Sequence, residues 1–262
     1  MNIKSPRPII LACALLGVIA TAPAQTQSVE SFRKVISREV GYRYLLHLPP
    51  GYAAEPGRTW PLIVFLHGSG ERGTDPWLVA KHGPPKLIRT PAAEGPAAEA
   101  AKLLANGFIV VSPQCPAGEW WDDETVLALT DDIATRHRVD PARIHLTGLS
   151  MGGFGTWSIA VNHPKRFATV VPICGGGNPV AVRRMARNRA ADLKELNVWA
   201  FHGAKDPTVA LSESESMVGA LKQAGVPRVQ FTVYPEAKHD SWTETYDNPA
   251  LYERSEEHTS EL

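Results

Sequence analysis

The strongest constraint on the fold is a short run, Pro61–Leu66 (PLIVFL), in which nearly every residue is apolar. A strand of this kind has to be buried on both faces, which is typical of the central strands of a parallel sheet. Similar runs recur along the chain, with helix-length segments between them. We expect strands at Phe32–Ser37, Tyr42–Leu48, Pro61–Leu66, Gly107–Ser112, Arg143–Thr147, Ala168–Ile173, Asn197–Phe201 and Val229–Tyr234.

Several of the segments between these strands have the features of helices, such as apolar residues at helical spacing and a glycine near the end. The alternation of strands and helices predicts an α/β fold with a mostly parallel twisted sheet flanked by helices and only a minimal cap. The Pro/Ala-rich stretch Pro84–Ala101 is expected to be a surface excursion, and the arginines of 183–189 a solvated helix face. We expect helices at Glu124–Arg138, Phe154–Asn162 and Ser212–Ala224.

The first 24 residues have the features of a secretory signal peptide. Lys4 and Arg7 precede the apolar run Ile9–Ala20, and Ala22-Pro23-Ala24 has the small residues of a cleavage site. An uncleaved anchor is the alternative, but the run is shorter than the ~20 apolar residues of a membrane span. We therefore expect residues 1–24 to be removed. The protein would then be exported, either periplasmic or secreted, with no stable membrane anchor after cleavage.

The rest of the chain is expected to form one α/β domain, residues 25–253. The last nine residues, Arg254–Leu262 (RSEEHTSEL), are charged and have no apolar face, and we expect this tail, 254–262, to be non-native sequence. Lys plus Arg and Asp plus Glu balance at 27 each, so no excess charge favours nucleic acid as a partner.

Two cysteines, Cys115 and Cys174, follow the signal segment. The predicted strands place them at the ends of two strands that have two others between them, about 14 Å apart. A disulfide needs Cα atoms about 4.4–6.8 Å apart, so we expect two free thiols. Because no Cys/His cluster has the spacing of a zinc site, we expect no metal and no cofactor.

A candidate nucleophile is Ser150, in Gly148-Leu149-Ser150-Met151-Gly152 between a predicted strand and a predicted helix. Glycines on both sides allow a sharp turn from strand to helix that exposes the serine hydroxyl. A serine hydroxyl is a poor nucleophile without a base to take its proton. An ordinary glycine-rich turn is the alternative interpretation of the same pattern.

The acid and the base are expected further along the chain, each just past a strand. Asp206 follows Asn197–Phe201, and His239 follows Val229–Tyr234. His239 would accept the serine proton, and Asp206 would hold the imidazole and offset its charge. Asp240 is the alternative acid. We expect His202 to be a packed residue near a strand end and His67 to brace the loop that follows its own strand.

An oxyanion hole completes the predicted site. One donor would be the N–H of Met151, which follows the nucleophile, and the other that of Ser69, with Gly70 as the alternative. Trp121 and Trp242 also lie past strand ends, where open α/β sheets bind ligands. We predict that they line the substrate pocket, and core packing is the alternative for each.

With these motifs in view, the chain resembles bacterial α/β hydrolases that include relatives of dienelactone hydrolases, feruloyl esterases and the catalytic domains of prolyl oligopeptidases. The resemblance rests on YRYLLHLPPGY, LIVFLHGSGERG, SPQCPAGEWW, RIHLTGLSMGGFGTW, VPICGGG, VWAFHGAKDPTV and YPEAKHDSWTETY. It implies an α/β-hydrolase fold and supports Ser150, Asp206 and His239. It breaks off at the tail, where family members continue their last helix.

The motifs and the resemblance together predict a serine esterase that acts through an acyl-enzyme on small-molecule or polysaccharide-linked esters. A serine peptidase of the prolyl-oligopeptidase type, acting on short peptides, is the first alternative. A non-catalytic binding protein on the same scaffold is the second, although such proteins usually lack a residue of the triad.

Overall fold

The computed structural model describes residues 31–257, with side chains as far as 253. The chain divides into two units, residues 1–39 and 40–262. The predicted signal peptide lies outside the described residues. In the first unit, residues 31–39 form no helix or strand, so the strand expected at Phe32–Ser37 was wrong. Phe32, Val35 and Ile36 are 84–91% exposed. A short run of this kind forms a strand only where a neighbouring strand pairs with it.

The second unit contains a seven-stranded sheet in the order β1-β3-β2-β4-β5-β6-β7. β1 is antiparallel to β3, and every other neighbouring pair is parallel. This confirms the predicted fold class, and each of the other seven predicted strands overlaps one strand of the sheet. The strands are β1 (Arg43–His47), β2 (Trp60–Leu66), β3 (Ile109–Gln114), β4 (Val139–Leu149), β5 (Thr169–Ile173), β6 (Asn197–Gly203) and β7 (Arg228–Tyr234).

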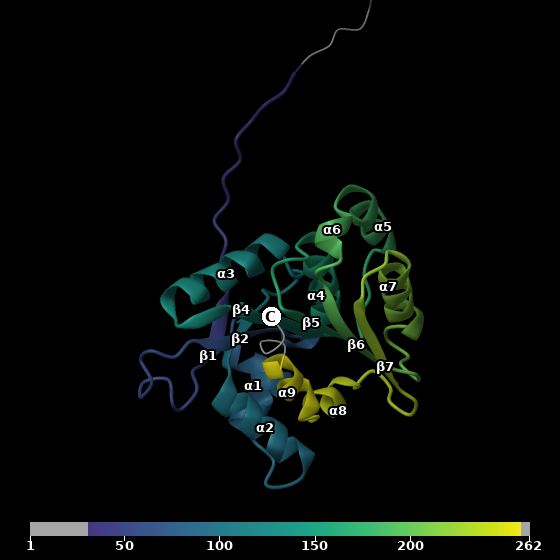
Figure 1. Cartoon of the computed structure of the whole chain (residues 1–262). Helices are drawn as coiled ribbons and strands as arrows, with labels where there is room; N and C mark the ends of the chain where they lie inside the picture. Colours follow the sequence, from purple (N-terminus) through teal and green to yellow (C-terminus); the bar gives the residue numbers. More distant parts are fainter. Residues whose placement is uncertain (1–30, 258–262) are drawn as a thin grey trace, which may run out of the picture. The chain divides into compact units, whose positions relative to one another are not determined.

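Helices cover both faces of this sheet (Figure 1). On one face lie α3 (Asp123–Arg136), α4 (Met151–Asn162), α5 (Pro179–Asn188) and α7 (Leu211–Gln223), which contact one another in that order. On the other face lie α1 (Gly83–Arg89), α2 (Pro96–Gly107), α8 (Trp242–Tyr246) and α9 (Ala250–Glu257). The short elements are η1 (Ser69–Glu71), η2 (Pro76–Lys81) and α6 (Ala190–Leu193).

The central strand β2 shows why both faces need cover. Leu62, Val64 and Leu66 belong to the core under α3, α4, α5 and α7. Ile63 and Phe65, which alternate with them, belong to the core under α1, α2, α8 and α9. All five side chains are at most 5% exposed, as expected for a strand buried on both sides.

The segment Pro84–Ala101 corrects another expectation. It contains most of α1 and the first half of α2, which pack against each other and cover one face of the sheet. Leu87, Ala100 and Ala101 are buried there. Proline is tolerated in the first turn of a helix, and both helices carry proline at that position. The abundance of proline therefore marked two helix starts and not an irregular loop.

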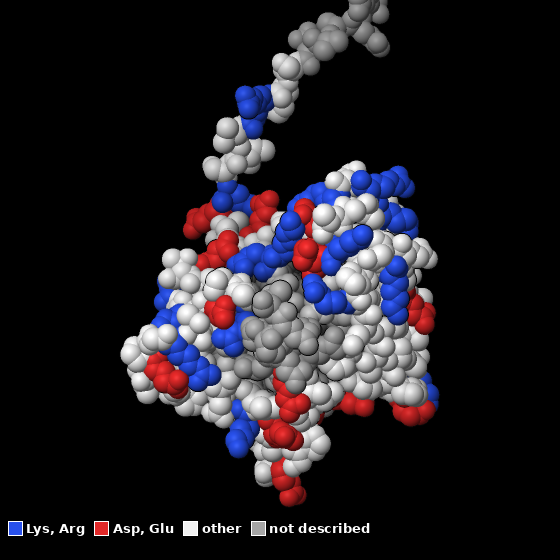
Figure 2. Space-filling view, in the orientation of Figure 1, with Lys and Arg blue, Asp and Glu red and all other residues white. Residues whose placement is uncertain are grey.

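The expectations for the two cysteines and for the arginines of α5 are confirmed. Cys115 follows β3 and Cys174 follows β5, with β2 and β4 between them, and both are buried free thiols. Arg183, Arg184 and Arg187 lie on the exposed face of α5, and Figure 2 shows Lys and Arg side chains gathered on this part of the surface. Within residues 31–257, no helix has the length and apolar character needed to cross a membrane.

Candidate active site

Ser150 occupies the turn between β4 and α4 in a strained conformation. Its φ of 52° and ψ of −117° lie outside the regions that residues with a Cβ usually adopt. Cys174, at the end of β5, has a φ of 40° and is the other non-glycine residue with positive φ in the described chain. The N–H of Ser150 donates to the carbonyl oxygen of Ile173 at 3.0 Å, which fixes the turn to the neighbouring strand. Backbone strain of this kind gathers at functional sites.

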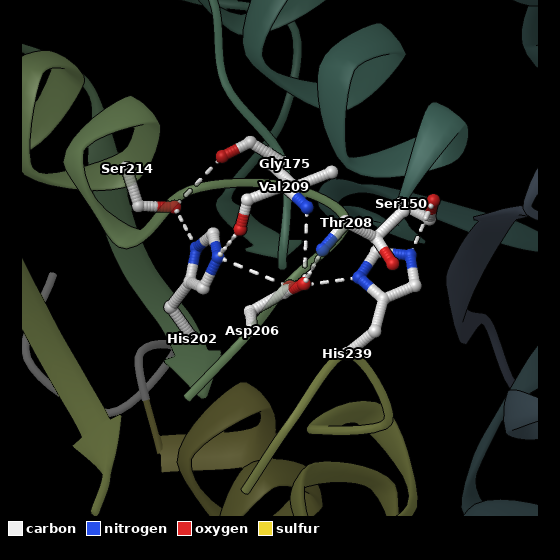
Figure 3. A network of polar contacts seen from close by, with 8 residues as sticks. All are labelled: Ser150, Gly175, His202, Asp206, Thr208, Val209, Ser214 and His239. Atoms are coloured by element: carbon white, nitrogen blue, oxygen red, sulfur yellow. Dashed lines mark hydrogen bonds and ion pairs between the residues drawn. The ribbon is translucent and has the colours of Figure 1, made fainter. Parts of the chain in front are cut away.

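His239 joins the serine to the acid. Its Nε2 lies 3.0 Å from Ser150 Oγ, and its Nδ1 lies 2.7 Å from Asp206 Oδ2 (Figure 3). Asp206 lies on the loop after β6 and His239 on the loop after β7, so parallel strands bring their loops together at one edge. The Asp206 side chain is fully buried, and that of His239 is 21% exposed. The structure thus brings together the three residues that the sequence predicts.

Asp206 is held as an ion by the groups around it. Oδ1 accepts the N–H groups of Thr208 and Val209 at 2.8 and 3.0 Å, and Oδ2 faces His239. Burial alone would raise the pKa of the Asp206 carboxyl, but the hydrogen bonds from His239, Val209 and Thr208 outweigh it and lower that pKa. The carboxylate is therefore available to orient His239 and to offset the charge of its imidazolium.

Asp240, the alternative acid, points elsewhere. Its carboxylate accepts the N–H and the hydroxyl of Thr243 at 3.1 and 3.0 Å, at the start of α8. It is exposed and serves as a helix cap.

The loop after β2 lies beside the nucleophile. A Cβ built on Gly68 would be 3.6 Å from the Cβ of Ser150. Ser69, the predicted second oxyanion donor, is the next residue and the first of η1, and it is exposed. Met151, the predicted first donor, is the first residue of α4. The roles of these two N–H groups remain predictions that this placement supports.

His67 holds that loop in place, as the sequence suggests. Its Nδ1–H donates to the carbonyl oxygen of Gly68 at 2.6 Å, and its Nε2 accepts the N–H of Cys115 at 3.0 Å. The ring is 1% exposed, and burial lowers its pKa to about 4, so it is neutral at pH 7. A neutral imidazole with one donor and one acceptor matches these two partners.

Trp121 does not have the predicted role. It is 8% exposed, packs in the core against Gly155, and donates its indole N–H to the carbonyl oxygen of His67 at 3.1 Å. Its contacts place it as a brace behind the loop after β2, which corrects our expectation of a substrate wall. Trp120, its neighbour, is 62% exposed and lies edge-on to Phe154, one helical turn after Ser150. Because both tryptophans lie in the irregular loop between β3 and α3, no periodic pattern in the sequence showed which one faces solvent.

Trp242 does lie beside the site. Its ring is edge-on to that of His239, with centroids 5.2 Å apart, and to that of His82 at 5.3 Å. Contact with substrate at this ring stays a prediction.

One group of three side chains in the described chain has atoms close enough for a shared metal ion. These are Cys174, Asp206 and His239, whose candidate ligand atoms lie within 4.8 Å of one another. A cysteine ligand has to be a thiolate. Burial raises the pKa of Cys174 to about 12, and His239 and Asp206 are already bonded to each other. This chemistry favours proton transfer over metal binding.

For His202, the sequence indicated only a packed residue near a strand end, and the structure shows a contact with the predicted catalytic acid as well. It is fully buried near the end of β6, and its Nε2 lies 3.3 Å from Asp206 Oδ2. A histidine four residues before a predicted catalytic acid, across a strand end, was the available signal.

Comparison with known proteins identifies relatives of this chain. The chain is 30% identical over 217 residues to poly(3-hydroxyalkanoate) depolymerase C of Paucimonas lemoignei, covering 67% of this chain and 50% of that one. It is 25% identical to dipeptidyl-peptidase 5 of Porphyromonas gingivalis, covering 59% of this chain and 29% of that one. The chain therefore spans half or less of the length of these relatives.

The fold is also similar to that of a solved structure. The crystal structure of a thermostable esterase superposes with a TM-score of 0.61 at 31% identity and covers 82% of this chain and 58% of that one. The sequence profile of the dienelactone hydrolase family matches residues 121–261, which include the segments around Ser150, Asp206 and His239. This chain belongs to the dienelactone hydrolase family, within the α/β-hydrolase superfamily.

Proposed function

We propose that this protein is an exported serine carboxylic-ester hydrolase in which Ser150 forms an acyl-enzyme. The observation that carries the proposal is the imidazole of His239, bonded to Ser150 Oγ through Nε2 and to buried Asp206 through Nδ1. This is the arrangement that removes a proton from a serine hydroxyl and returns it to a leaving group. Export rests on the predicted signal peptide alone.

The reaction follows from these contacts. His239 Nε2 takes the proton of Ser150 as Oγ attacks the ester carbonyl, and Asp206 offsets the charge of the imidazolium that forms. The N–H groups of Met151 and Ser69 stabilise the negative oxygen of the tetrahedral intermediate. His239 then gives the proton to the departing alcohol. Water, activated by His239, releases the acid and restores Ser150.

The substrates we propose are small or polymer-linked esters, such as acetyl or feruloyl groups on polysaccharide. The loop that carries Ser69 and Gly70 is exposed beside Ser150, and Trp120 is exposed on the neighbouring loop. An open site of this kind admits an ester at the end or side of a long polymer. The similarity to a poly(3-hydroxyalkanoate) depolymerase supports the same substrate class.

A p-nitrophenyl ester series from acetate to octanoate tests the proposal. We expect hydrolysis that is fastest on the short chains, and a loss of at least ~10⁴-fold in Ser150→Ala. Ser158→Ala is the matched control, since Ser158 lies on the same helix, exposed, and bonds to Asp123. Full activity in Ser150→Ala would contradict the mechanism.

A serine peptidase is the second candidate, because the chain is similar to dipeptidyl-peptidase 5. Dipeptide p-nitroanilides, measured beside the esters, separate the two. Cleavage of the anilides with a kcat/KM above that of the acetate ester, lost in Ser150→Ala, would replace the esterase proposal and keep the same triad.

A further inference from the structure

The polar network around Asp206 extends beyond the three predicted residues. His202 lies on the far side of Asp206 from His239 (Figure 3). Its Nε2 is 3.0 Å from the carbonyl oxygen of Val209 and 3.3 Å from Asp206 Oδ2. Its Nδ1 is 2.8 Å from Ser214 Oγ, and that hydroxyl is 2.8 Å from the carbonyl oxygen of Gly175. The His202 and Ser214 residues are fully buried.

The number of protons in this network follows from the chemistry of its atoms. A carbonyl oxygen only accepts hydrogen bonds, so the one hydroxyl proton of Ser214 goes to Gly175. Ser214 Oγ therefore accepts from His202, and Nδ1 carries a proton. Val209 O and the Asp206 carboxylate also only accept, so Nε2 carries a proton too. If the ring of His202 were neutral, one of its nitrogens would carry no proton and would face an atom that can only accept.

We propose that His202 is a buried imidazolium whose counter-ion is Asp206, and that it is a positioning residue for that carboxylate. A buried charge is stable only where it is paired and hydrogen-bonded, and His202 meets both conditions. Its role in catalysis rests on the proposed function. His202 and His239 contact Asp206 from opposite sides. Asp206 therefore lies between two imidazolium rings when His239 becomes charged.

The other charged groups near this pair leave the assignment intact. Cys174, after β5, has atoms close to Asp206 and His239, and burial raises its pKa to about 12, so it stays neutral. On α7, the neighbours of Ser214 are Glu213 and Glu215, and both are exposed. On the loops after β6 and β7, Lys205 and Lys238 are exposed, and Lys205 pairs with Glu236.

The charge of His202 also affects the reaction, through Asp206 and His239. His202 offsets part of the negative charge of Asp206, and so reduces the pull of Asp206 on the proton of His239. His239 is then free to act as a base at lower pH than it would with Asp206 unopposed. The acid limb of the pH profile of kcat/KM should therefore lie at lower pH in the wild type than in a variant without the charge of His202.

Nitrogen-15 NMR of histidine-labelled protein tests the protonation state directly, without substrate. We expect both ring nitrogens of His202 to be protonated at pH 7 and at pH 8. His67 supplies the reference in the same spectrum, because its Nδ1 donates and its Nε2 accepts. The His202 signals are assigned by their loss in His202→Gln, with His202→Asn as a second variant if the first does not fold. An unprotonated nitrogen in His202 would overturn the proposal.

The pH profile of kcat/KM on p-nitrophenyl acetate tests the positioning role. Glutamine keeps a donor toward Asp206 and removes the charge, so we expect the acid limb of His202→Gln to move up by about 0.5–1 pH unit. His47→Gln, which changes a half-buried histidine on β1 that contacts Ala105, is the matched control. A merely structural role would lower the melting temperature without moving the limb, and an unmoved limb would overturn the proposal. An inactive wild type would count against the esterase, while the NMR result would still decide the state of His202.

Discussion

Gly152, in the first turn of α4, lies so close to Leu66, the last residue of β2, that a Cβ on Gly152 would be 1.9 Å from the Leu66 carbonyl oxygen. Non-bonded heavy atoms need about 3.5 Å. The helix that begins after Ser150 is therefore pressed against the start of the loop that carries Ser69. This contact sets the distance between the nucleophile and the predicted oxyanion donors.

We predict that Gly152→Ala destabilises the fold by about 3 kcal/mol or more, because backbone has to move at both elements. Activity should fall with stability, since the same movement separates Ser150 from Ser69. Urea unfolding and ester hydrolysis measure the two effects. Gly219→Ala is the control: Gly219 lies within α7 with no atom within 4 Å of a built Cβ, and alanine there should stabilise by about 0.5–1 kcal/mol. Wild-type stability in Gly152→Ala would refute the contact.

A second prediction concerns the acid. Asp206→Asn should lower kcat by about 10³–10⁴-fold, because an amide N–H₂ facing Nδ1 no longer stabilises the correct tautomer of His239. Asp240→Asn is the matched control for the neighbouring acid, which caps α8. It should leave stability nearly unchanged, because asparagine accepts the same hydrogen bonds at a helix start about as well as aspartate, and leave kcat within about two-fold of the wild type. The reverse order of the two effects on kcat would make Asp240 the acid.

The site could be predicted from the sequence largely because parallel strands end at one edge. Once the runs ending near Thr147, Phe201 and Tyr234 are recognised as parallel strands of one sheet, the loops after them are expected to lie along the same edge. Ser150, Asp206 and His239 were then the residues of suitable chemistry in those loops, and the structure brings them into contact.

Other features depend on contacts that no local pattern records. Phe32–Ser37 contains the apolar and β-branched residues of a short strand but forms no strand in the described chain. Trp120 and Trp121 differ only in which of them meets the core. The role of His202 needs Ser214 and Gly175, which lie 12 residues after it and 27 before it, at hydrogen-bonding distance. These are properties of the folded chain and not of sequence spacing.

A third prediction is a loss of stability in acid that depends on His67. Burial lowers its pKa to about 4 in the folded protein, against about 6.5 in the unfolded chain. As the pH falls below 6.5, the imidazole of His67 becomes protonated in the unfolded chain, whereas in the folded protein it stays neutral until about pH 4. The stability that His67 lends above pH 6.5 is therefore lost across this window, on the order of 3 kcal/mol in total.

His67→Gln keeps an acceptor for Cys115 and does not titrate, so its stability should fall less between pH 7.5 and pH 4.5. Urea unfolding at the two values measures the difference, and His47→Gln should keep the wild-type dependence on pH. If His67→Gln loses as much stability as the wild type over this range, the acid sensitivity comes from other groups and our account of His67 is wrong.

The two adjacent tryptophans give the last prediction, since they differ in burial and not in chemistry. Trp121→Ala should cost about 3–5 kcal/mol, because it removes a core ring and the donor to the His67 carbonyl oxygen. Trp120→Ala should leave the melting temperature unchanged and raise KM for aromatic acyl esters about five-fold, because exposed Trp120 and half-buried Phe154 form an aromatic pair one helical turn from Ser150. Thermal unfolding and kinetics on feruloyl and acetyl esters separate the two effects. An unchanged KM for the feruloyl ester would show that Trp120 faces solvent and not substrate.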